Sequence, residues 1–366
     1  MNQLTACYLT THGIHMFTQT LTRRVLGSGL VDLLTGPHGV DRYTELMAPT
    51  WTLGDARARV LAARRTTPRS VTLTLEPNLA FRGFQAGQHI NLTVEIAGRR
   101  RTRCYSAASA QGAPVIELTI GRHDGGLVST FLFDQAHAGM VVGLDGVGGD
   151  FVLPADRPRR ILFVSGGSGI TPVMSMLRTL RAEGYDGEAA FIHYARCAEE
   201  ACYRHELAAM PNLRVLHGFT RSEHAGDLAG HFGPDHLAAA IDSPEVVYVC
   251  GPPALADAVR EHCDNVKSES FVPPNVVVPA QSSGGRVAFT DSGVTVTDDG
   301  RSLLDQAEAA GLTPDSGCRM GICHTCTRRK TSGVVRNLTT GATSRTDEED
   351  VQICVSAPVG DVELAL

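Results

Sequence analysis

The chain has 366 residues, a length that predicts two or three domains of ordinary size. Its formal net charge is −6 with 20% charged residues, and it has no arginine-rich tail of the kind that binds nucleic acid. No uninterrupted apolar run reaches the roughly 18 residues that a membrane-spanning helix needs. The 10 cysteines show no disulfide pattern. We therefore expect a cytoplasmic protein that binds no nucleic acid and is not integral to a membrane; no pattern predicts its oligomeric state.

Residues 1–50 form a predicted helical N-terminal extension. Apolar side chains recur at helical spacing from Leu21 to Leu34, and the pattern ends at Gly36 and Pro37. We favour packing of this apolar stripe on the next domain. Peripheral contact with a membrane or a partner, helped by a neighbouring arginine pair, stays open as the alternative.

Residues 51–155 change to a two-residue rhythm. Alternating strands are expected at 71–75, 90–94 and 115–120, separated by turn residues. Several short strands at this spacing predict a small antiparallel β-barrel.

Two pieces of this barrel suit a flavin nucleotide. At the end of one strand, Tyr105 can lie against a flat isoalloxazine, Arg103 can pair with a phosphate, and Ser106 can hydrogen-bond a ring nitrogen. About twenty residues later, Gly125 and Gly126 open a helix whose backbone N–H groups suit a pyrophosphate. Each piece alone is common, but the combination on one barrel predicts a flavin site.

Residues 156–271 predict a nucleotide-binding α/β domain. An apolar strand at 160–164 leads into a glycine loop at 165–172 and then a helix, the arrangement that brings backbone close to a dinucleotide pyrophosphate. Pro172 stands where the six-residue dinucleotide fingerprint has its last glycine. Further strands, which imply a parallel sheet with helical crossovers, are expected at 189–194, 213–219 and 246–249.

Cys250 follows the last of these strands and precedes Gly251 and Pro252. A thiol at the carboxyl edge of an open parallel sheet stands where ligands bind in such folds. The alternative is a small buried side chain before a turn.

Residues 272–285 are rich in Pro, Ser and Gly without periodicity, which predicts an interdomain linker. In residues 286–366, two short strands flank a turn, and a helix at 302–310 leads into a loop rich in cysteine.

Four thiols in this last region follow the C-x4-C-x2-C…C spacing that holds a [2Fe–2S] cluster: Cys318, Cys323, Cys326 and Cys354. Gly317 and Gly321 let backbone N–H groups turn toward the sulfur atoms, which tunes the reduction potential. Structural zinc is the alternative, although zinc usually takes two closely spaced pairs of ligands.

These motifs together resemble a known family. Residues 52–271 resemble ferredoxin–NADP reductase-like flavoproteins, and residues 286–366 resemble plant-type ferredoxins. The resemblance implies a multidomain protein with an antiparallel β-barrel flavin domain, an α/β parallel-sheet nucleotide domain and an α+β (β-grasp) ferredoxin domain. The fused order is similar to reductases that supply oxygenases and desaturases. More narrowly, residues 37–43 and 320–326 are similar to actinobacterial oxidoreductases that donate electrons to membrane stearoyl-CoA desaturase.

The resemblance also implies roles for single residues and favours FAD over FMN. The flavin motif would comprise Arg103, Tyr105 and Ser106, with Thr119 assigned to the same site, and the pyrophosphate loop would comprise Gly126, Val128 and Ser129. The NAD(P) loop would comprise Gly167, Gly169, Thr171 and Pro172, and the motif beside the nicotinamide Cys250, Gly251 and Pro252. Cys250 and Ser106 would line the hydride-transfer site, and Phe271 would lie where two-domain members place an aromatic residue over the flavin.

The choice between NADPH and NADH depends on the residues that meet the adenosine ribose. A 2′-phosphate requires a cation, whereas NAD sites commonly present a carboxylate. Arg196 follows the second sheet strand, and Thr220 and Arg221 follow the third. Glu199 and Glu200 lie close to Arg196 and weaken the argument. We favour NADPH, and NADH stays open.

A flavin and a cluster on one chain convert a hydride donor into a source of single electrons. We therefore expect an NAD(P)H-dependent oxidoreductase that serves a separate redox acceptor protein, most simply a membrane fatty-acyl desaturase. The alternatives are the reductase component of a Rieske-type oxygenase or other hydroxylase, and a non-catalytic sensing module that binds flavin and zinc. The acidic run at 347–350 is either solvated surface or a docking patch for a basic partner.

Overall fold

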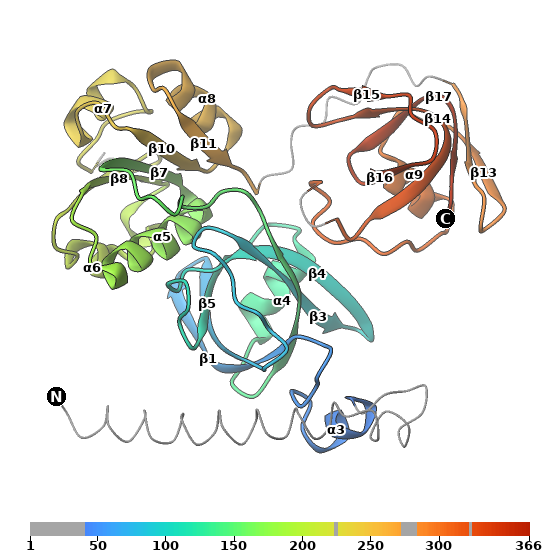
Figure 1. Cartoon of the computed structure of the whole chain (residues 1–366), viewed down its shortest axis with the longest axis horizontal. Coiled ribbons are helices and arrows are strands. Elements are labelled where there is room, and N and C mark those ends of the chain that lie inside the picture. Colours follow the sequence, from blue (N-terminus) through green and yellow to red (C-terminus); the bar gives the residue numbers. More distant parts are fainter. Residues whose placement is uncertain (1–40, 223–225, 272–283, 322–323) are drawn as a thin grey trace.

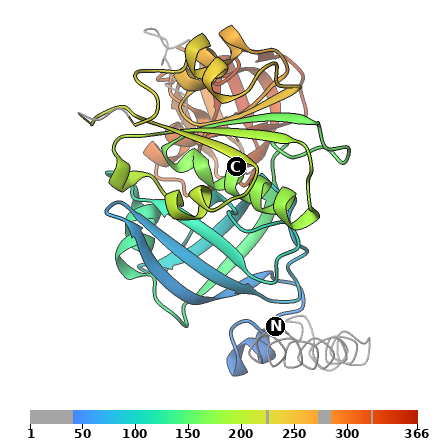
Figure 2. The ribbon, with the colours of Figure 1, turned by 90° about the vertical axis from the view of Figure 1, so that its left-hand side faces the viewer.

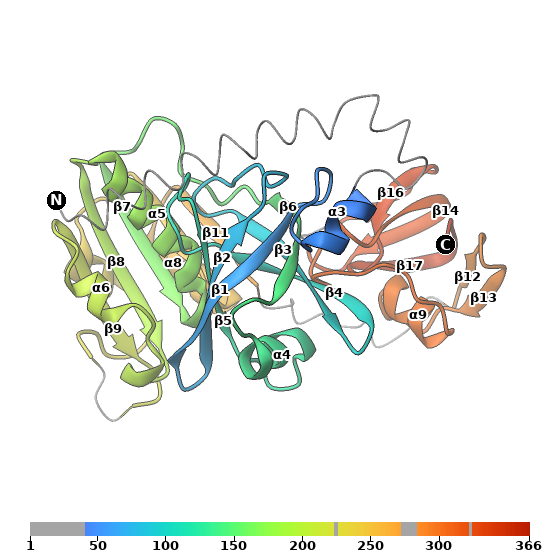
Figure 3. The same cartoon turned by 90° about the horizontal axis from the view of Figure 1, so that it is seen from below.

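The computed structural model describes residues 41–222, 226–271, 284–321 and 324–366 (Figure 1). The predictions for residues 1–40, for most of the linker and for Cys323 lie outside the described residues. Three sheets follow one another along the chain. Seen from below, the first sheet lies between the other two (Figure 3).

The first sheet has six antiparallel strands in the order β4-β3-β6-β1-β2-β5. Its end strands β4 and β5 lie beside each other without pairing, so the sheet curls into a partly open barrel. Its elements are β1 (Arg57–Thr67), β2 (Ser70–Pro77), β3 (His89–Ile96), β4 (Arg99–Ser106), β5 (Ile116–Gly121), β6 (Val141–Gly148) and helix α4 (Leu127–Gln135), which packs against it.

Alternating apolar residues build the barrel core. Leu73 and Leu75 of β2, Ile90 and Leu92 of β3, and Leu118 of β5 are fully buried in one cluster. Each such side chain stabilises the fold by roughly 1.5–3 kcal/mol relative to an exposed one. The predicted antiparallel architecture is confirmed. The predicted strands 71–75 and 90–94 fall within β2 and β3, and the predicted strand 115–120 overlaps β5, which begins and ends one residue later.

The second sheet is parallel, with strand order β11-β10-β7-β8-β9. Its strands are β7 (Arg160–Gly166), β8 (Glu188–Ala195), β9 (Leu213–Phe219), β10 (Val246–Cys250) and β11 (Val266–Glu269). One face packs against α5 (Ile170–Glu183) and α6 (Arg204–Ala208), and the other against α7 (Pro234–Ala240) and α8 (Pro253–His262). The predicted parallel-sheet domain is confirmed, and Figure 2 shows this sheet above the barrel.

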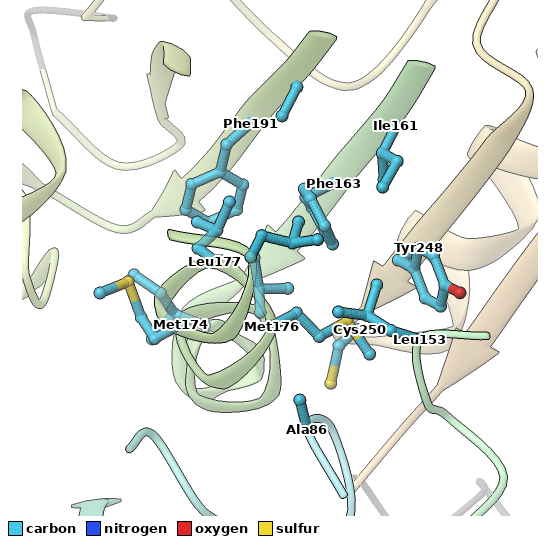
Figure 4. Packing of buried hydrophobic residues seen from close by; sticks show 14 of the residues in the cluster. Ala86, Leu153, Ile161, Phe163, Met174, Met176, Leu177, Phe191, Tyr248 and Cys250 are labelled. Atoms are coloured by element: carbon cyan, nitrogen blue, oxygen red, sulfur yellow. The ribbon is translucent and has the colours of Figure 1, made fainter. Parts of the chain in front are cut away.

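The core between this sheet and α5 continues to the barrel. The rings of Phe163 and Tyr248 stack with their centroids 5.7 Å apart, and Leu177 of α5 belongs to the same buried cluster (Figure 4). Ala86, from the loop before β3, also belongs to this cluster and lies near Cys250 (Figure 4). The barrel and the nucleotide sheet therefore share continuous apolar packing.

Hydrogen bonds join the same two bodies. Nη1 of Arg178 donates to Glu117 Oε1 of the barrel over 2.9 Å and to the Ala108 carbonyl over 2.8 Å. Its other nitrogens bond both carboxylate oxygens of Glu206 on α6 over 2.7 Å. Tyr203 adds a bond to Glu117 over 3.1 Å. This network fixes the orientation of the nucleotide sheet on the barrel.

The third sheet is mixed, because β12 pairs in parallel with β17 while its other pairs are antiparallel. Its strands are β12 (Arg286–Phe289), β13 (Val294–Thr297), β14 (Thr327–Asn337), β15 (Thr343–Ser344), β16 (Glu349–Gln352) and β17 (Ser356–Leu364). Helix α9 (Leu303–Ala309) buries Leu303 and Leu304 against this sheet. Ser302 caps α9 by accepting a hydrogen bond from the Asp305 N–H over 3.2 Å.

Helix α3 (Asp41–Met47) precedes the barrel and is tied to it. The Asp41 carboxylate accepts hydrogen bonds from the N–H groups of Leu53 and Gly54 over 2.6 and 2.8 Å. Glu45 pairs with Arg57 of β1 over 2.9 Å. In the described part of the chain, no helix has the length and hydropathy needed to cross a bilayer.

Candidate functional site

A cavity of about 810 Å³ lies between the barrel and the nucleotide sheet. It brings together many of the residues that the sequence placed in cofactor sites: Thr119, Gly167, Gly169, Thr171, Arg196, Arg221, Cys250, Gly251, Pro252 and Phe271. The remaining predicted flavin residues lie on β4 and at the start of α4, outside the lining of this cavity.

The glycine loop and the Cys250 motif, predicted separately, pack backbone against backbone. A Cβ on Gly169 would come within 2.0 Å of the Cys250 carbonyl oxygen, and a Cβ on Gly166 within 2.9 Å of Pro252 Cδ. Gly167 has a positive φ of 57°. The loop therefore needs glycine, and it leaves backbone N–H groups at the start of α5 for a pyrophosphate.

The other two predicted loop residues stabilise this turn. The Thr171 hydroxyl donates to the Ser168 carbonyl over 3.2 Å. Pro172 is buried within the first turn of α5, where a proline costs no hydrogen bond.

Cys250 is completely buried near Glu269, a residue that the sequence did not single out. Burial, with the charge of Glu269 added, raises the pKa of the Cys250 thiol well above its ordinary value. His89 of β3 lies with its Nδ1 3.6 Å from Glu269 Oε1, and both side chains are almost fully buried. The thiol is therefore protonated near neutral pH.

Glu269 and Phe271 place the end of the nucleotide domain against the barrel. Burial raises the pKa of the Glu269 carboxyl, while His89 opposes the rise. The Phe271 and His89 rings meet edge to face with centroids 6.3 Å apart. Glu269 Oε2 is buried without a hydrogen-bond partner among the described residues. It can therefore donate a hydrogen bond to a ligand when the carboxyl is protonated, or accept one when it is ionised.

Ser106 is the residue of β4 that best fits a bound flavin. Its side chain is buried, and its Oγ has no hydrogen-bond partner among the described residues. Such an orphaned hydroxyl is costly unless a ligand pairs with it. Ser106 also lies opposite His89 in the β3–β4 register, which places it near the Glu269 pair. Tyr105 is half-buried against the barrel core, and burial raises the pKa of its phenol.

Arg103, which the sequence assigns to a phosphate, also contacts the loop that carries Cys318. Its Nη1 donates to the carbonyl of Gly317, directly before Cys318, over 2.7 Å. The same nitrogen donates to the Thr102 carbonyl over 2.8 Å. The guanidinium thus bridges the barrel and the cysteine loop.

The predicted pyrophosphate loop is a tight turn at the start of α4. Val128 is buried in the barrel core, and the Ser129 hydroxyl accepts the His123 N–H over 3.2 Å. Their contribution to a phosphate site would therefore come from the free N–H groups of the first helical turn. Thr119 bonds Thr72 over 2.6 Å and also Tyr203, so its hydroxyl already joins the two domains.

The donor set of the cysteine loop fits an iron–sulfur cluster. Cys318, Cys326 and Cys354 are all buried, and a hydrogen bond from the Cys354 thiol to Cys326, together with burial, raises the pKa of Cys354. The Met320 N–H points at Cys318 Sγ over 3.3 Å, and the Gly321 N–H bonds the Cys354 sulfur. Thiolates with backbone donors are the ligands and outer shell that such clusters require.

Two arginines stand side by side at the ends of β8 and β9. The Arg221 N–H donates to the Arg196 carbonyl over 2.8 Å, and both residues line the cavity. Glu200 lies 3.8 Å from the Arg196 guanidinium and neutralises part of its charge.

The acidic run at 347–350 is engaged within the ferredoxin domain. Arg329 pairs with Glu348 over 3.2 Å and with Asp350 over 3.3 Å. Asp347 accepts the Gly333 N–H over 3.2 Å. These contacts favour solvated surface over a docking patch.

Comparison with protein families places three models along the chain. An oxidoreductase FAD-binding domain matches residues 66–153, an oxidoreductase NAD-binding domain residues 163–261, and a 2Fe-2S iron-sulfur cluster binding domain residues 288–359.

Curated proteins and solved structures match most of the chain. An NADPH oxidoreductase of Mycobacterium tuberculosis is 36% identical over 349 residues, 90% of each chain. A glycine betaine monooxygenase reductase subunit of Pseudomonas aeruginosa is 30% identical, over 78% of this chain and 88% of that protein. Phthalate dioxygenase reductase superposes with a TM-score of 0.58 at 25% identity, over 85% of this chain and 97% of that structure.

Proposed function

Since the chain belongs to the family of NAD(P)H oxidoreductases that carry FAD and a [2Fe–2S] cluster, we propose that it draws on NADPH and reduces a separate oxygenase-class iron protein. The membership identifies an electron-transfer enzyme with these cofactors. The zinc interpretation and the non-catalytic sensor are therefore wrong.

When bound, the flavin accepts a hydride and gives up single electrons, which the cluster carries one at a time. The chain's own groups prepare this chemistry. The glycine loop and the start of α5 bind the dinucleotide pyrophosphate, and Cys250, Gly251 and Pro252 line the nicotinamide end of the cavity. Ser106 would hydrogen-bond the flavin ring, and the N–H groups at the start of α4 would bind its pyrophosphate.

Glu269, His89 and Cys250 supply a dry environment with a proton close by. The raised pKa of the Glu269 carboxyl keeps it protonated at a higher pH than an exposed glutamate. The raised pKa of the Cys250 thiol keeps this side chain uncharged at the nicotinamide end of the cavity. Phe271 closes the barrel side of the cavity and excludes water.

The preference for NADPH rests on the pair Arg196 and Arg221. Both guanidinium groups line the cavity at the ends of neighbouring parallel strands, where the adenosine ribose of a dinucleotide would lie. A planar guanidinium suits a phosphate better than a ribose hydroxyl. The M. tuberculosis relative, named an NADPH oxidoreductase, supports this choice.

The chain supplies electrons and leaves the final oxidation to another protein. Apart from the cysteine loop, the described residues form no group of side chains suited to a metal ion. Two relatives are named as reductases of a monooxygenase and a dioxygenase, which supports an oxygenase as acceptor. A membrane fatty-acyl desaturase is the second candidate, supported by the sequence resemblance of residues 37–43 and 320–326.

Reconstitution tests the proposal. Purified protein with NADPH is combined separately with a Rieske-type oxygenase and with a membrane desaturase in vesicles, and the oxidised product of each is measured. Product from the oxygenase alone supports the first candidate, and product from the desaturase alone supports the second. Reduction of neither, by a protein whose flavin and cluster bleach with NADPH, would contradict both. Faster bleaching by NADH than by NADPH would overturn the preference for NADPH.

A further inference from the structure

One strand of the barrel carries side chains directed at both redox sites. Ser106, at the end of β4, holds the orphaned hydroxyl of the flavin site, and Arg103 contacts the cysteine loop through the Gly317 carbonyl over 2.7 Å. Because a strand rises about 3.3 Å per residue, these two positions are about 10 Å apart. Gly317 is buried and directly precedes the cluster ligand Cys318.

The ferredoxin domain is joined to the other domains much more sparsely than those are to each other. The single side chain of Arg178 joins the barrel to α6 by hydrogen bonds to three acceptor groups, the Glu117 carboxylate, the Ala108 carbonyl and the Glu206 carboxylate. Between the described residues of the ferredoxin domain and those of the rest of the chain there is no ion pair, and the bond from Arg103 to Gly317 is the side-chain hydrogen bond that connects them.

We propose that Arg103 is the docking residue that holds the cysteine loop, the segment with Gly317 and Cys318, beside the flavin site. The guanidinium has five N–H donors in a planar fork, and the contacts to Gly317 and Thr102 use one nitrogen. Nε and Nη2 remain for a phosphate, so the contact expected for the flavin nucleotide and the docking contact do not compete. This role is independent of which protein accepts the electrons.

The charge of Arg103 also acts on the cluster. Accepting one electron makes the cluster more negative by one charge, without forming or breaking a bond. A cation held beside Cys318 stabilises the reduced form more than the oxidised form, and therefore raises the reduction potential. Docking thus brings the cysteine loop close to the flavin site and makes electron transfer to the cluster more favourable.

The substitution Arg103→Gln in the full-length holoprotein tests the proposal. It removes the charge and the fork but keeps a polar side chain of similar length. We expect a larger maximum dimension in small-angle X-ray scattering, a lower midpoint potential in an EPR-monitored titration of the cluster, and at least tenfold slower cluster reduction in stopped-flow experiments, corrected for bound FAD. Arg100→Gln is the matched control, because Arg100 lies on the same strand, is exposed and pairs with Asp145 over 3.3 Å; it should behave as the wild type.

A second variant carries the test if Arg103→Gln does not retain FAD. Arg103→Lys keeps a charge for a phosphate, but its ammonium ends one bond short of the Nη1 position. If docking depends on the guanidinium, this variant should still show the larger maximum dimension and the slower cluster reduction. If an FAD-loaded variant matches the wild type in scattering, in cluster potential and in the corrected rate, Arg103 serves the flavin phosphate alone and the proposal fails.

Discussion

His89 Nδ1 lies 3.6 Å from Glu269 Oε1, and this pair joins the barrel strand β3 to the last strand of the nucleotide sheet. Both side chains are buried, and Glu269 also raises the pKa of the Cys250 thiol beside it. A carboxyl and an imidazole thus meet at the edge of the predicted hydride-transfer site. Neither is exposed enough for water to replace its partner.

Replacing Glu269 with glutamine should make the protein more stable at pH 8. Burial raises the folded-state pKa of this carboxyl above its ordinary value of 4.5, so the stability that the protonated group contributes is lost as the pH rises through the folded pKa. Glutamine does not ionise and avoids that loss. Melting curves from pH 4 to 8 should show the difference growing with pH, while Glu261→Gln, at an exposed position of α8, follows the wild type. A less stable variant at pH 8 would mean that the attraction of His89 outweighs burial.

Gly169→Ala should weaken both the fold and dinucleotide binding. The backbone at Gly169 is helical, with φ −62°, so alanine adds no backbone strain, but its Cβ would meet the Cys250 carbonyl oxygen at 2.0 Å. Such overpacking costs about 1–3 kcal/mol. Denaturant titration and the KM for NADPH measure both effects. Gly233→Ala, the control, has no atom within 4 Å of its Cβ; because Gly233 is the N-cap of α7, it should cost about 1 kcal/mol or less of stability and leave the KM for NADPH unchanged.

Arg221→Gln should raise the KM for NADPH on the order of tenfold, about 1.4 kcal/mol, and leave the KM for NADH nearly unchanged. The 2′-phosphate loses a charge-assisted partner, whereas NADH has no phosphate at that position. Steady-state ferricyanide reduction, run with each donor in turn, measures the two KM values. Arg214→Gln, at the other end of β9 and exposed, is the control. Equal effects on the two donors would place Arg221 away from the 2′-phosphate.

Arg178→Met should destabilise the protein by about 2–3 kcal/mol, because it leaves the carboxylates of Glu117 and Glu206 without the cation that they share. The loss is smaller than for a fully buried pair, since Glu206 keeps 34% of its side chain exposed. Arg157→Met breaks a similar two-bond pair with the more exposed Glu183 and should cost about 1 kcal/mol or less. Urea unfolding of both variants makes the comparison, and equal losses would argue against a domain-joining role.

Local chemistry made much of this molecule predictable. The cysteine spacing predicts a cluster because its first three proposed ligands lie within nine residues of one another. The glycine loop is recognisable because a turn that approaches a phosphate needs glycine. Strand β1 was not expected, since its arginines hide the alternation of buried Ala58 and Val60. Non-local pairs left no signal. His89 and Glu269 are far apart in sequence, and Arg103 finds a backbone carbonyl, an acceptor that every residue type carries.

The unpaired flank of the barrel at β4 has a consequence for the solution behaviour of the protein. A strand with one unpaired edge can recruit a strand from another molecule and start aggregation, and positively charged side chains on that strand are a common protection. Arg99, Arg100 and Arg101 supply such a run at the start of β4. Repulsion between such runs on two molecules opposes intermolecular sheet growth at this edge, while the edge stays accessible to the chain's own ferredoxin domain.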